Sequence, residues 1–225
     1  MIIQALTLTL RLALIVSAIL LVIGVPLAYW LAYSPRRWKF FIEALVSLPI
    51  VLPPTVLGFY LLVALGPLSP AGRWYQETTG HTLAFTFEGL VIGSVLYSLP
   101  FAVQPMTTSF AAIDPKLAQA SALLGASRWR TFWRILLPLG LPGVLTGFVL
   151  SFAHTLGEFG VVLMIGGNIP GATRTISILI YDQVEALDYA AANRTALLLL
   201  ALCFVLLAAI YGLRRSALWN LWEWR

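Results

Sequence analysis

Charged residues are scarce in this sequence of 225 residues. Only 10% are Asp, Glu, Lys or Arg, whereas 60% are hydrophobic. In an ordinary soluble domain about 25% of residues are charged, so this chain lacks the polar surface that a globular protein needs in water. The composition therefore indicates a membrane protein.

The residues and motifs that support catalysis or metal binding are also nearly absent. A single cysteine, Cys203, excludes an intrachain disulfide and a Cys-rich metal site. The two histidines, His81 and His154, belong to no HExxH motif, and the sequence contains neither G-x-x-x-x-G-K-[ST] nor G-x-S-x-G. We expect no catalytic residue, no metal and no cofactor in this chain. Channels, carriers and permease subunits remain as candidate classes.

The few charges that are present gather in clusters separated by long apolar stretches. These stretches cover roughly residues 7–33, 40–66, 86–110, 136–166 and 195–213, and the charges within them are Arg11, Glu43, Glu88 and Glu158. Backbone groups in lipid must be satisfied within their own segment, and the stretches lack the alternation of a barrel strand. The sequence predicts an all-α membrane protein, with residues 1–225 forming one domain of about five transmembrane helices.

The distribution of Lys and Arg predicts the orientation of these helices. Ten of the 14 basic residues lie in the first loop, the third loop and the C-terminal tail, and three lie in the other loops. The ten are Arg36, Arg37, Lys39, Lys116, Arg128, Arg130, Arg134, Arg214, Arg215 and Arg225. Cytoplasmic loops carry the excess of positive charge, so we expect the N-terminus outside and the C-terminus in the cytoplasm. The basic balance thus reflects topology and predicts no nucleic-acid partner.

The third loop contains signals for two short helices. Asp114 followed by Pro115 predicts a helix start, Gly125 predicts a left-handed stop, and Ser127 can cap a second helix rich in Arg and aromatic residues. Such a segment suits a basic helix lying on anionic lipid and a docking site for a partner protein equally well. The residues alone do not separate these two alternatives.

The same loop resembles the cytoplasmic signature of ABC importer permeases. That signature is Glu-Ala-Ala, three residues, Gly, nine residues, then Ile-x-Leu-Pro, and both spacings are kept here, although Gln119 replaces the Glu and Ser121 the second Ala. The resemblance implies the type I (MetI-like) importer permease fold and a cytoplasmic coupling loop at about residues 111–135 that docks on an ATPase. The implied coupling residues are Gln119, Ala120, Leu124, Gly125, Ala126, Trp129, Phe132, Trp133 and Pro138.

A second resemblance, from about residue 5 to residue 215, concerns the cargo. Leu156-Gly157-Glu158-Phe159-Gly160 is similar to a motif of oxyanion permeases, and Asn168-Ile169-Pro170-Gly171 with Thr173-Arg174-Thr175-Ile176 resembles their molybdate branch. This implies a permease subunit that moves molybdate across the inner membrane of a bacterium. Sulfate, thiosulfate or tungstate permeases of the same family are the alternatives. An ATP-independent anion channel or carrier, which would need no docking loop, is a further one.

The resemblance also implies partners. We expect a second copy of the chain, because five spans are too few to enclose a path and a gate. Two cytoplasmic ATPase subunits would carry the ATP and Mg²⁺, and an external binding protein would deliver the substrate. Membrane lipid surrounds the assembly.

Glu158 is the charge that lies deepest within a predicted span. An unpaired carboxylate at membrane depth costs about 3 kcal/mol or more, so Glu158 should face a cavity or a partner. His154 precedes it by four residues, which predicts an interaction on one helix face. We expect both at a translocation gate, with Gly157 and Gly160 allowing helices of two subunits to approach closely. A carboxylate repels a dianion, so a structural or gating role is favoured over a role as substrate ligand.

Three further expectations concern the loops and the helices beside them. Asn168, Thr173, Arg174 and Thr175 form a candidate outer mouth, where Arg and hydroxyl donors suit an oxyanion. An ordinary solvated loop arginine that contacts the binding protein is the alternative for Arg174, and the residues favour it slightly. Residues 175–192 have the apolar spacing of one amphipathic helix. At the cytoplasmic side, Lys39 and Glu43 are four residues apart and should pair.

Overall fold

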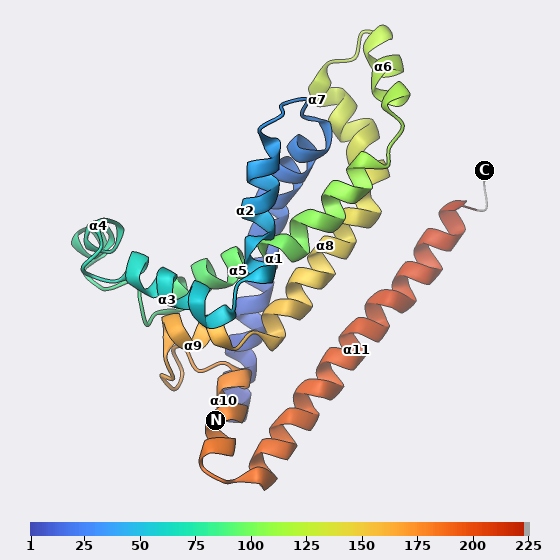
Figure 1. The fold of residues 1–225 in the computed structure, drawn as a ribbon. Helices are drawn as coiled ribbons and strands as arrows, with labels where there is room; N and C mark the ends of the chain where they lie inside the picture. Colours follow the sequence, from blue (N-terminus) through green and yellow to red (C-terminus); the bar gives the residue numbers. More distant parts are fainter. Residues whose placement is uncertain (223–225) are drawn as a thin grey trace.

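The computed structural model describes residues 1–222, which form a bundle of long helices with shorter ones at both ends (Figure 1). No strand occurs in this described part of the chain. The helices are α1 (Ile2–Tyr33), α2 (Lys39–Val51), α3 (Pro54–Leu65), α4 (Pro70–Thr79), α5 (Phe87–Ala111), α6 (Pro115–Leu123), α7 (Arg128–Thr131), the π-helical turn η1 (Phe132–Leu136), α8 (Leu137–Gly157), α9 (Gly160–Gly166), α10 (Ile176–Glu185) and α11 (Tyr189–Trp222).

The helices confirm an all-α protein with about five membrane spans. Four are long and apolar enough to cross a bilayer: α1, α5, the continuous stretch Arg128–Gly157, and α11. The fifth span is α2 together with α3, which meet at an angle of 113°. Pro53 and Pro54 lack the N–H groups that an unbroken helix would need, so the span breaks there.

Two expectations about helix boundaries are wrong. The stretch 136–166 is not one helix, because α8 ends at Gly157 and α9 begins at Gly160. Residues 175–192 are not one amphipathic helix either, because Leu187 takes a φ of +58° between α10 and α11. The Asp188 carboxylate accepts a hydrogen bond from the Ala191 N–H at 3.0 Å and so caps α11, which begins six residues before the expected position 195.

The core lies where α1, α5 and α8 pack together. Glycines on α8 permit this packing: a Cβ on Gly143 would lie 2.2 Å from the Cβ of Ser109, and one on Gly147 would lie 2.5 Å from the Ala102 carbonyl oxygen. A buried hydroxyl pair, Ser98 with Thr155 at 3.0 Å, also joins α5 to α8. The small residues thus bring the two helices into close contact, as in other membrane bundles.

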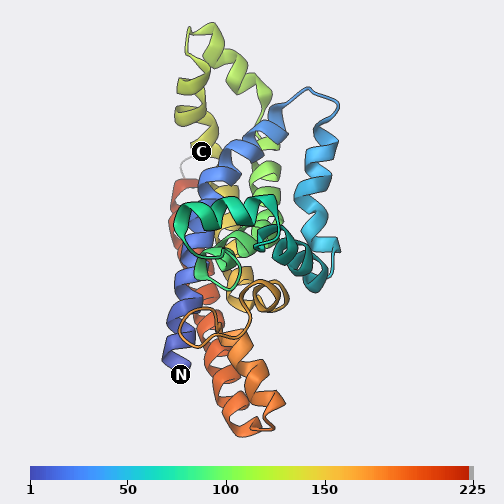
Figure 2. The same cartoon turned by 90° about the vertical axis from the view of Figure 1, so that its left-hand side faces the viewer.

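Figures 1 and 2 place the α1–α2 turn and the loop with α6 and α7 at one end of the bundle, and the N-terminus with α10 at the other. The basic residues of the first and third loops therefore gather at a single end. Of the basic tail, Arg225 lies outside the described residues. α11 runs beside the bundle with most of its surface exposed, and in Figure 1 its C-terminal part points toward the end that carries α6.

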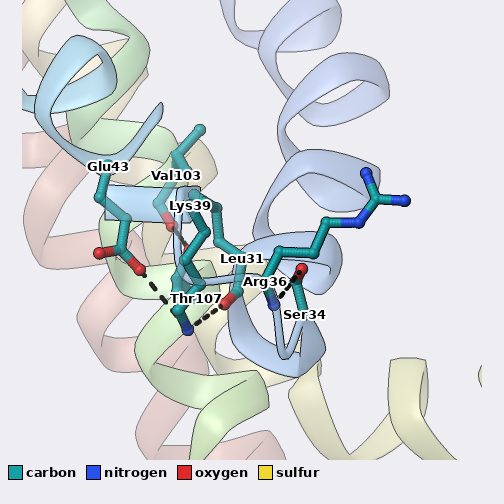
Figure 3. A network of polar contacts seen from close by, with 7 residues as sticks. All are labelled: Leu31, Ser34, Arg36, Lys39, Glu43, Val103 and Thr107. Carbon is teal, nitrogen blue, oxygen red and sulfur yellow. Dashed lines mark hydrogen bonds and ion pairs between the residues drawn. The ribbon is translucent and has the colours of Figure 1, made fainter. Parts of the chain in front are cut away.

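The turn between α1 and α2 is held by the predicted pair Lys39–Glu43, whose Nζ and Oε1 atoms are 3.7 Å apart (Figure 3). The Lys39 ammonium also donates to the carbonyl oxygen of Leu31 at 3.0 Å. That carbonyl lies in the last turn of α1, where helix carbonyls lack intrahelical partners. The pairing is confirmed, and its further effect is to tie the start of α2 to the end of α1.

We predict that Gly143→Ala destabilises the protein, because the new methyl would overlap Ser109 and the Pro105 carbonyl, only 2.6 Å from the added Cβ. Overpacking of this kind costs about 1–3 kcal/mol. Thermal unfolding of the detergent-purified protein measures the loss. Gly212→Ala is the matched control, since nothing lies within 4 Å of a Cβ added there. Equal melting temperatures for the two variants would refute the packing argument.

Candidate functional site

The third loop has the local geometry that its sequence predicts. The Asp114 carboxylate accepts a hydrogen bond from the Lys116 N–H at 2.9 Å, with Pro115 at the first helical position of α6. Gly125 has a φ of +77°, the left-handed conformation that a residue with a side chain rarely adopts. The Ser127 hydroxyl accepts from the Arg130 N–H at 3.3 Å and caps α7. The two predicted helices and their boundary signals are confirmed.

A hydrogen bond between two buried hydroxyl groups joins α6 to α7. The oxygens of Ser121 and Thr131 are 2.8 Å apart, and both residues are almost fully buried. The Thr131 hydroxyl donates to the Ser127 carbonyl at 3.1 Å, which leaves it free to accept from Ser121. Ser121, which departs from the family signature, therefore has a structural partner. The role of Thr131 could not be predicted from the sequence, because the two residues are ten positions apart and meet only after the chain turns at Gly125.

Most of the predicted coupling residues are exposed at the tip of this loop. Leu124 is 89% exposed, and Trp129 and Trp133 also present large apolar surfaces to solvent. Gln119, Ala120, Gly125 and Pro138 are exposed, whereas Ala126 is half-buried. Phe132 is also half-buried, because its ring packs 5.1 Å from that of Tyr29 on α1. Phe132 thus joins the loop to the bundle, while the other large side chains face outward.

The loop continues into the membrane through the π-helical turn η1. Pro138 has no N–H for the Arg134 carbonyl, and its ring would clash with that carbonyl in a regular helix. The preceding turn widens instead, and the Leu137 N–H donates to the Phe132 carbonyl five residues earlier. The helix nevertheless continues from Arg128 to Gly157, so the loop and the span α8 form one continuous element.

A cavity of about 550 Å³ lies where the two broken spans meet. Pro54 and Thr55 line it at the start of α3, and His154 and Glu158 line it at the end of α8. Tyr97 on α5 contributes another side of the wall. Figure 1 shows α3 and α9 side by side, and the contact of Pro54 with Gly160 brings them together. The cavity is not fully enclosed by this chain.

Glu158 is 3% exposed, and neither carboxyl oxygen has a hydrogen-bond partner among the described residues. Ser94 lies beside this carboxyl without the geometry of a hydrogen bond. The ring of His154 stacks on Phe101, with centroids 3.9 Å apart, and its Nε2 is unpartnered among these residues. The cavity therefore combines unsatisfied polar atoms with an apolar wall.

The predicted interaction between His154 and Glu158 is absent from the described structure, which contains no hydrogen bond or ion pair between them. The prediction assumed that both residues lie on one helix. Glu158 instead has an extended backbone, with φ −64° and ψ 133°, because α8 has already ended at Gly157. The two side chains therefore do not share a helix face, although both line the same cavity.

The two glycines of the predicted gate differ in their surroundings. A Cβ on Gly160 would lie 2.7 Å from the Cβ of Pro54, so this glycine permits a close approach between α9 and α3 of the same chain. A Cβ on Gly157 would meet nothing within 4 Å. Close approach of two subunits at these positions stays a prediction.

The predicted outer mouth is a closed polar network. Arg174 donates to the Asn168 side-chain oxygen and lies 3.5 Å from the Asp182 carboxylate, which in turn accepts from the Asn168 amide at 3.0 Å. Thr173 is buried and donates to the Gly166 carbonyl at 2.6 Å. Thr175, also buried, caps α10. The two threonines thus hold the loop together and face the protein interior, and among these residues an anion-guiding role stays a prediction for Arg174 and Asn168.

The sequence reasoning missed three residues near the cavity: Thr55, Tyr97 and Ser94. Thr55 had a usable signal, because it follows the Pro53-Pro54 pair that breaks the span. Tyr97 and Ser94 had none, since they lie within an unbroken apolar helix and become important only through the packing of α5 against α8.

The helix order, the broken spans and the helical loop at one end form a fold that solved ABC importers share. The MetNI methionine ABC transporter shares this fold, with a TM-score of 0.73 at 16% identity over 96% of this chain and 95% of that one. A bacterial alginate ABC transporter, solved with its alginate-bound periplasmic protein, gives a TM-score of 0.74 at 18% identity, covering 96% of this chain and 78% of that one.

Residues 24–217 match the family described as the binding-protein-dependent transport system inner membrane component, and the chain belongs to this family. It is 51% identical to the molybdenum transport system permease protein ModB of Azotobacter vinelandii, over 94% of this chain and 93% of that protein. The Escherichia coli K12 protein of the same name is 38% identical over 81% and 80%. A probable sulfate transport permease, cysT of Chlorokybus atmophyticus, is 34% identical over 83% and 65%.

We predict that the hydrogen bond between Ser121 and Thr131 orders α6. Ser121→Ala should weaken the loop by about 1 kcal/mol, because it removes one buried hydrogen bond. Thr131→Val should weaken it more, because it also removes the bond from the Thr131 hydroxyl to the Ser127 carbonyl. Hydrogen–deuterium exchange of the α6 amides measures the effect. In the double variant the losses should not add, since both changes remove the same bond. Additive effects would show that the hydroxyls act independently.

Proposed function

We propose that the protein is the membrane subunit of an ATP-driven importer that moves molybdate into the bacterial cytoplasm. The observation that carries the proposal is the 51% identity to a molybdenum transport permease over nearly the whole of both chains. Sulfate is the alternative cargo, supported by a less similar relative. Tungstate, another tetrahedral dianion, is the other alternative.

The exposed apolar tip of the third loop supports docking on an ATPase. Leu124, Trp129 and Trp133 present surface that a soluble groove can bury, and the energy of such contacts comes mostly from large apolar anchors. Two ATPase subunits bind and hydrolyse ATP with Mg²⁺, while this chain contributes no catalytic group. An external binding protein delivers the oxyanion at the opposite end of the bundle.

The connection between loop and cavity supports a mechanical role. The hydrogen bond between Ser121 and Thr131 fixes α6 on α7, and α7 continues through η1 into α8. α8 in turn ends at Gly157, which lines the cavity together with Glu158. Movement of the docked loop along this continuous element is therefore transmitted to the place where the spans break.

A second copy of the chain completes the path. The cavity is not fully enclosed by one chain, and on the side of Gly157, which lines it, nothing lies within 4 Å of an added Cβ. A homodimer would close that side and place two equivalent cavities about a shared axis, as closed two-fold symmetry requires. The gathering of basic loops at one end supports a cytoplasmic position for that end, with the N-terminus outside.

Reconstitution tests the proposed function. The permease, the ATPase and the binding protein are assembled in proteoliposomes, and ATP hydrolysis and molybdate uptake are measured together. We expect the molybdate-loaded binding protein to raise ATPase activity and to drive uptake that requires ATP. Uptake that proceeds without ATP would instead establish a channel or carrier. Stimulation by sulfate and not by molybdate would assign the other cargo.

A pair of leucine variants tests docking and orientation. Leu124 and Leu68 are similarly exposed, at 89% and 86%, but Leu124 lies in the third loop and Leu68 lies between α3 and α4. Leu124→Glu should abolish co-purification of the ATPase, because a carboxylate would be buried in an apolar contact. Leu68→Glu should retain it. Loss of the ATPase with Leu68→Glu alone would reverse the assigned orientation.

A further inference from the structure

We propose that the cavity between the broken spans binds the transported oxyanion transiently inside the membrane, and that Glu158 serves there as an uncharged hydrogen-bonding group. The inference rests on the proposed function and deepens it, since it assigns the substrate a site in this chain. The ligand class is a tetrahedral dianion.

The position of the cavity supports a substrate site. Many transporters bind their substrates where discontinuous helices meet near the middle of the membrane, with half-helix N-termini facing anionic groups. Here α3 begins at Pro54 on the cavity wall, at the 113° bend of its span. Its twelve residues place a partial positive charge at that end. The volume, about 550 Å³, is within the range of small-molecule sites.

The wall of the cavity has a polar part and an apolar part. Thr55, Tyr97 and His154 bring groups that donate hydrogen bonds, while Leu163 and Met164 supply apolar wall. No Lys or Arg lines the cavity. Hydrogen-bond donors without a full positive charge would hold a dianion weakly, which suits a site that must also release it.

Glu158 has no counter-charge in these surroundings. The one basic residue inside a predicted span, Arg11, lies over the ring of Phe87, 4.7 Å from its centroid. An ionised Glu158 would therefore be a buried and uncompensated charge, which is costly at membrane depth. The uncharged acid avoids this cost, does not repel a dianion, and can donate a hydrogen bond to it. The objection that a carboxylate repels molybdate then no longer applies.

The carboxyl oxygens are shielded from water in this conformation, although the residue lines the cavity. They reach an oxyanion when the Glu158 side chain turns toward the open part of the cavity. Gly157, the neighbouring residue, also lines the cavity and has nothing within 4 Å of an added Cβ. Substrate contact is thus coupled to movement at the end of α8.

Substitutions at Glu158 test the role of its charge in the reconstituted complex. Glu158→Ala should lower ATP-driven molybdate uptake about tenfold, because the hydrogen-bonding group is lost. Glu158→Gln, which is uncharged and keeps a donor, should restore uptake to within about threefold of the wild type. Glu88→Ala is the matched control, since Glu88 lies in the exposed first turn of α5, away from the cavity. An impaired Glu158→Gln protein, or an unimpaired Glu158→Ala protein, would overturn the proposal.

Cysteine protection tests occupancy without changing Glu158. Ala153 lines the cavity, so Ala153→Cys in a Cys203→Ala background places one thiol at the site. Molybdate, tungstate or sulfate should slow labelling of this thiol by a small methanethiosulfonate reagent, whereas chloride should not. Labelling that none of the three oxyanions slows would overturn the site.

The outcomes separate the two proposals. Wild-type complex that takes up no molybdate contradicts the proposed cargo, whereas protection of the thiol by sulfate or tungstate would still support an oxyanion site. Normal molybdate uptake, combined with no protection by any oxyanion, contradicts the site and leaves the proposed function intact.

Discussion

Every backbone N–H and C=O within the lipid has to find a partner inside the protein, and this requirement is hardest to meet where a span breaks. Pro53 and Pro54 offer no N–H to the carbonyls of Pro49 and Ile50, so α2 cannot continue into α3. The chain breaks again between Gly157 and Gly160. The two breaks lie together around one cavity. The backbone groups left without helical partners there can face the protein and the cavity instead of lipid. The position of the candidate site follows from this constraint.

The same constraint explains how the end of the bundle that carries α6 and α7 is joined to the site. Pro138 stands at the start of α8, and the protein accommodates it by widening one turn, without interrupting the helix. The stretch Arg128–Gly157 is therefore one continuous helical element from the third loop to the cavity wall. The Ser121–Thr131 bond adds α6 to this element. Proline thus has opposite consequences in the two places: a pair breaks the second span, while a single one at a helix start leaves the fourth continuous.

Much of the fold and of the coupling loop could be predicted from the sequence, because the signals there are local. The apolar stretches, Asp114 with Pro115, Gly125 and the pair Lys39–Glu43 each act within a few residues. The cavity could not be predicted, because it depends on contacts between residues far apart in sequence, such as Pro54 with Gly160. The expected pairing of His154 with Glu158 is wrong for a related reason: spacing by four residues has meaning only if the helix continues between them.

The burial of the Glu158 carboxyl without hydrogen-bond partners suits a segment that changes conformation better than a rigid one. A carboxyl group that were purely structural would be expected to have donors fixed around it, as Asp182 has in Asn168 and Arg174. Beside Glu158 lies the Ser94 hydroxyl, which makes no hydrogen bond to either carboxyl oxygen in the described structure. The unsatisfied oxygens of Glu158 raise the free energy of the conformation seen here relative to any conformation in which they are bonded. A group in this position favours rearrangement of the end of α8, and an oxyanion that supplies the missing bond would bias the same rearrangement.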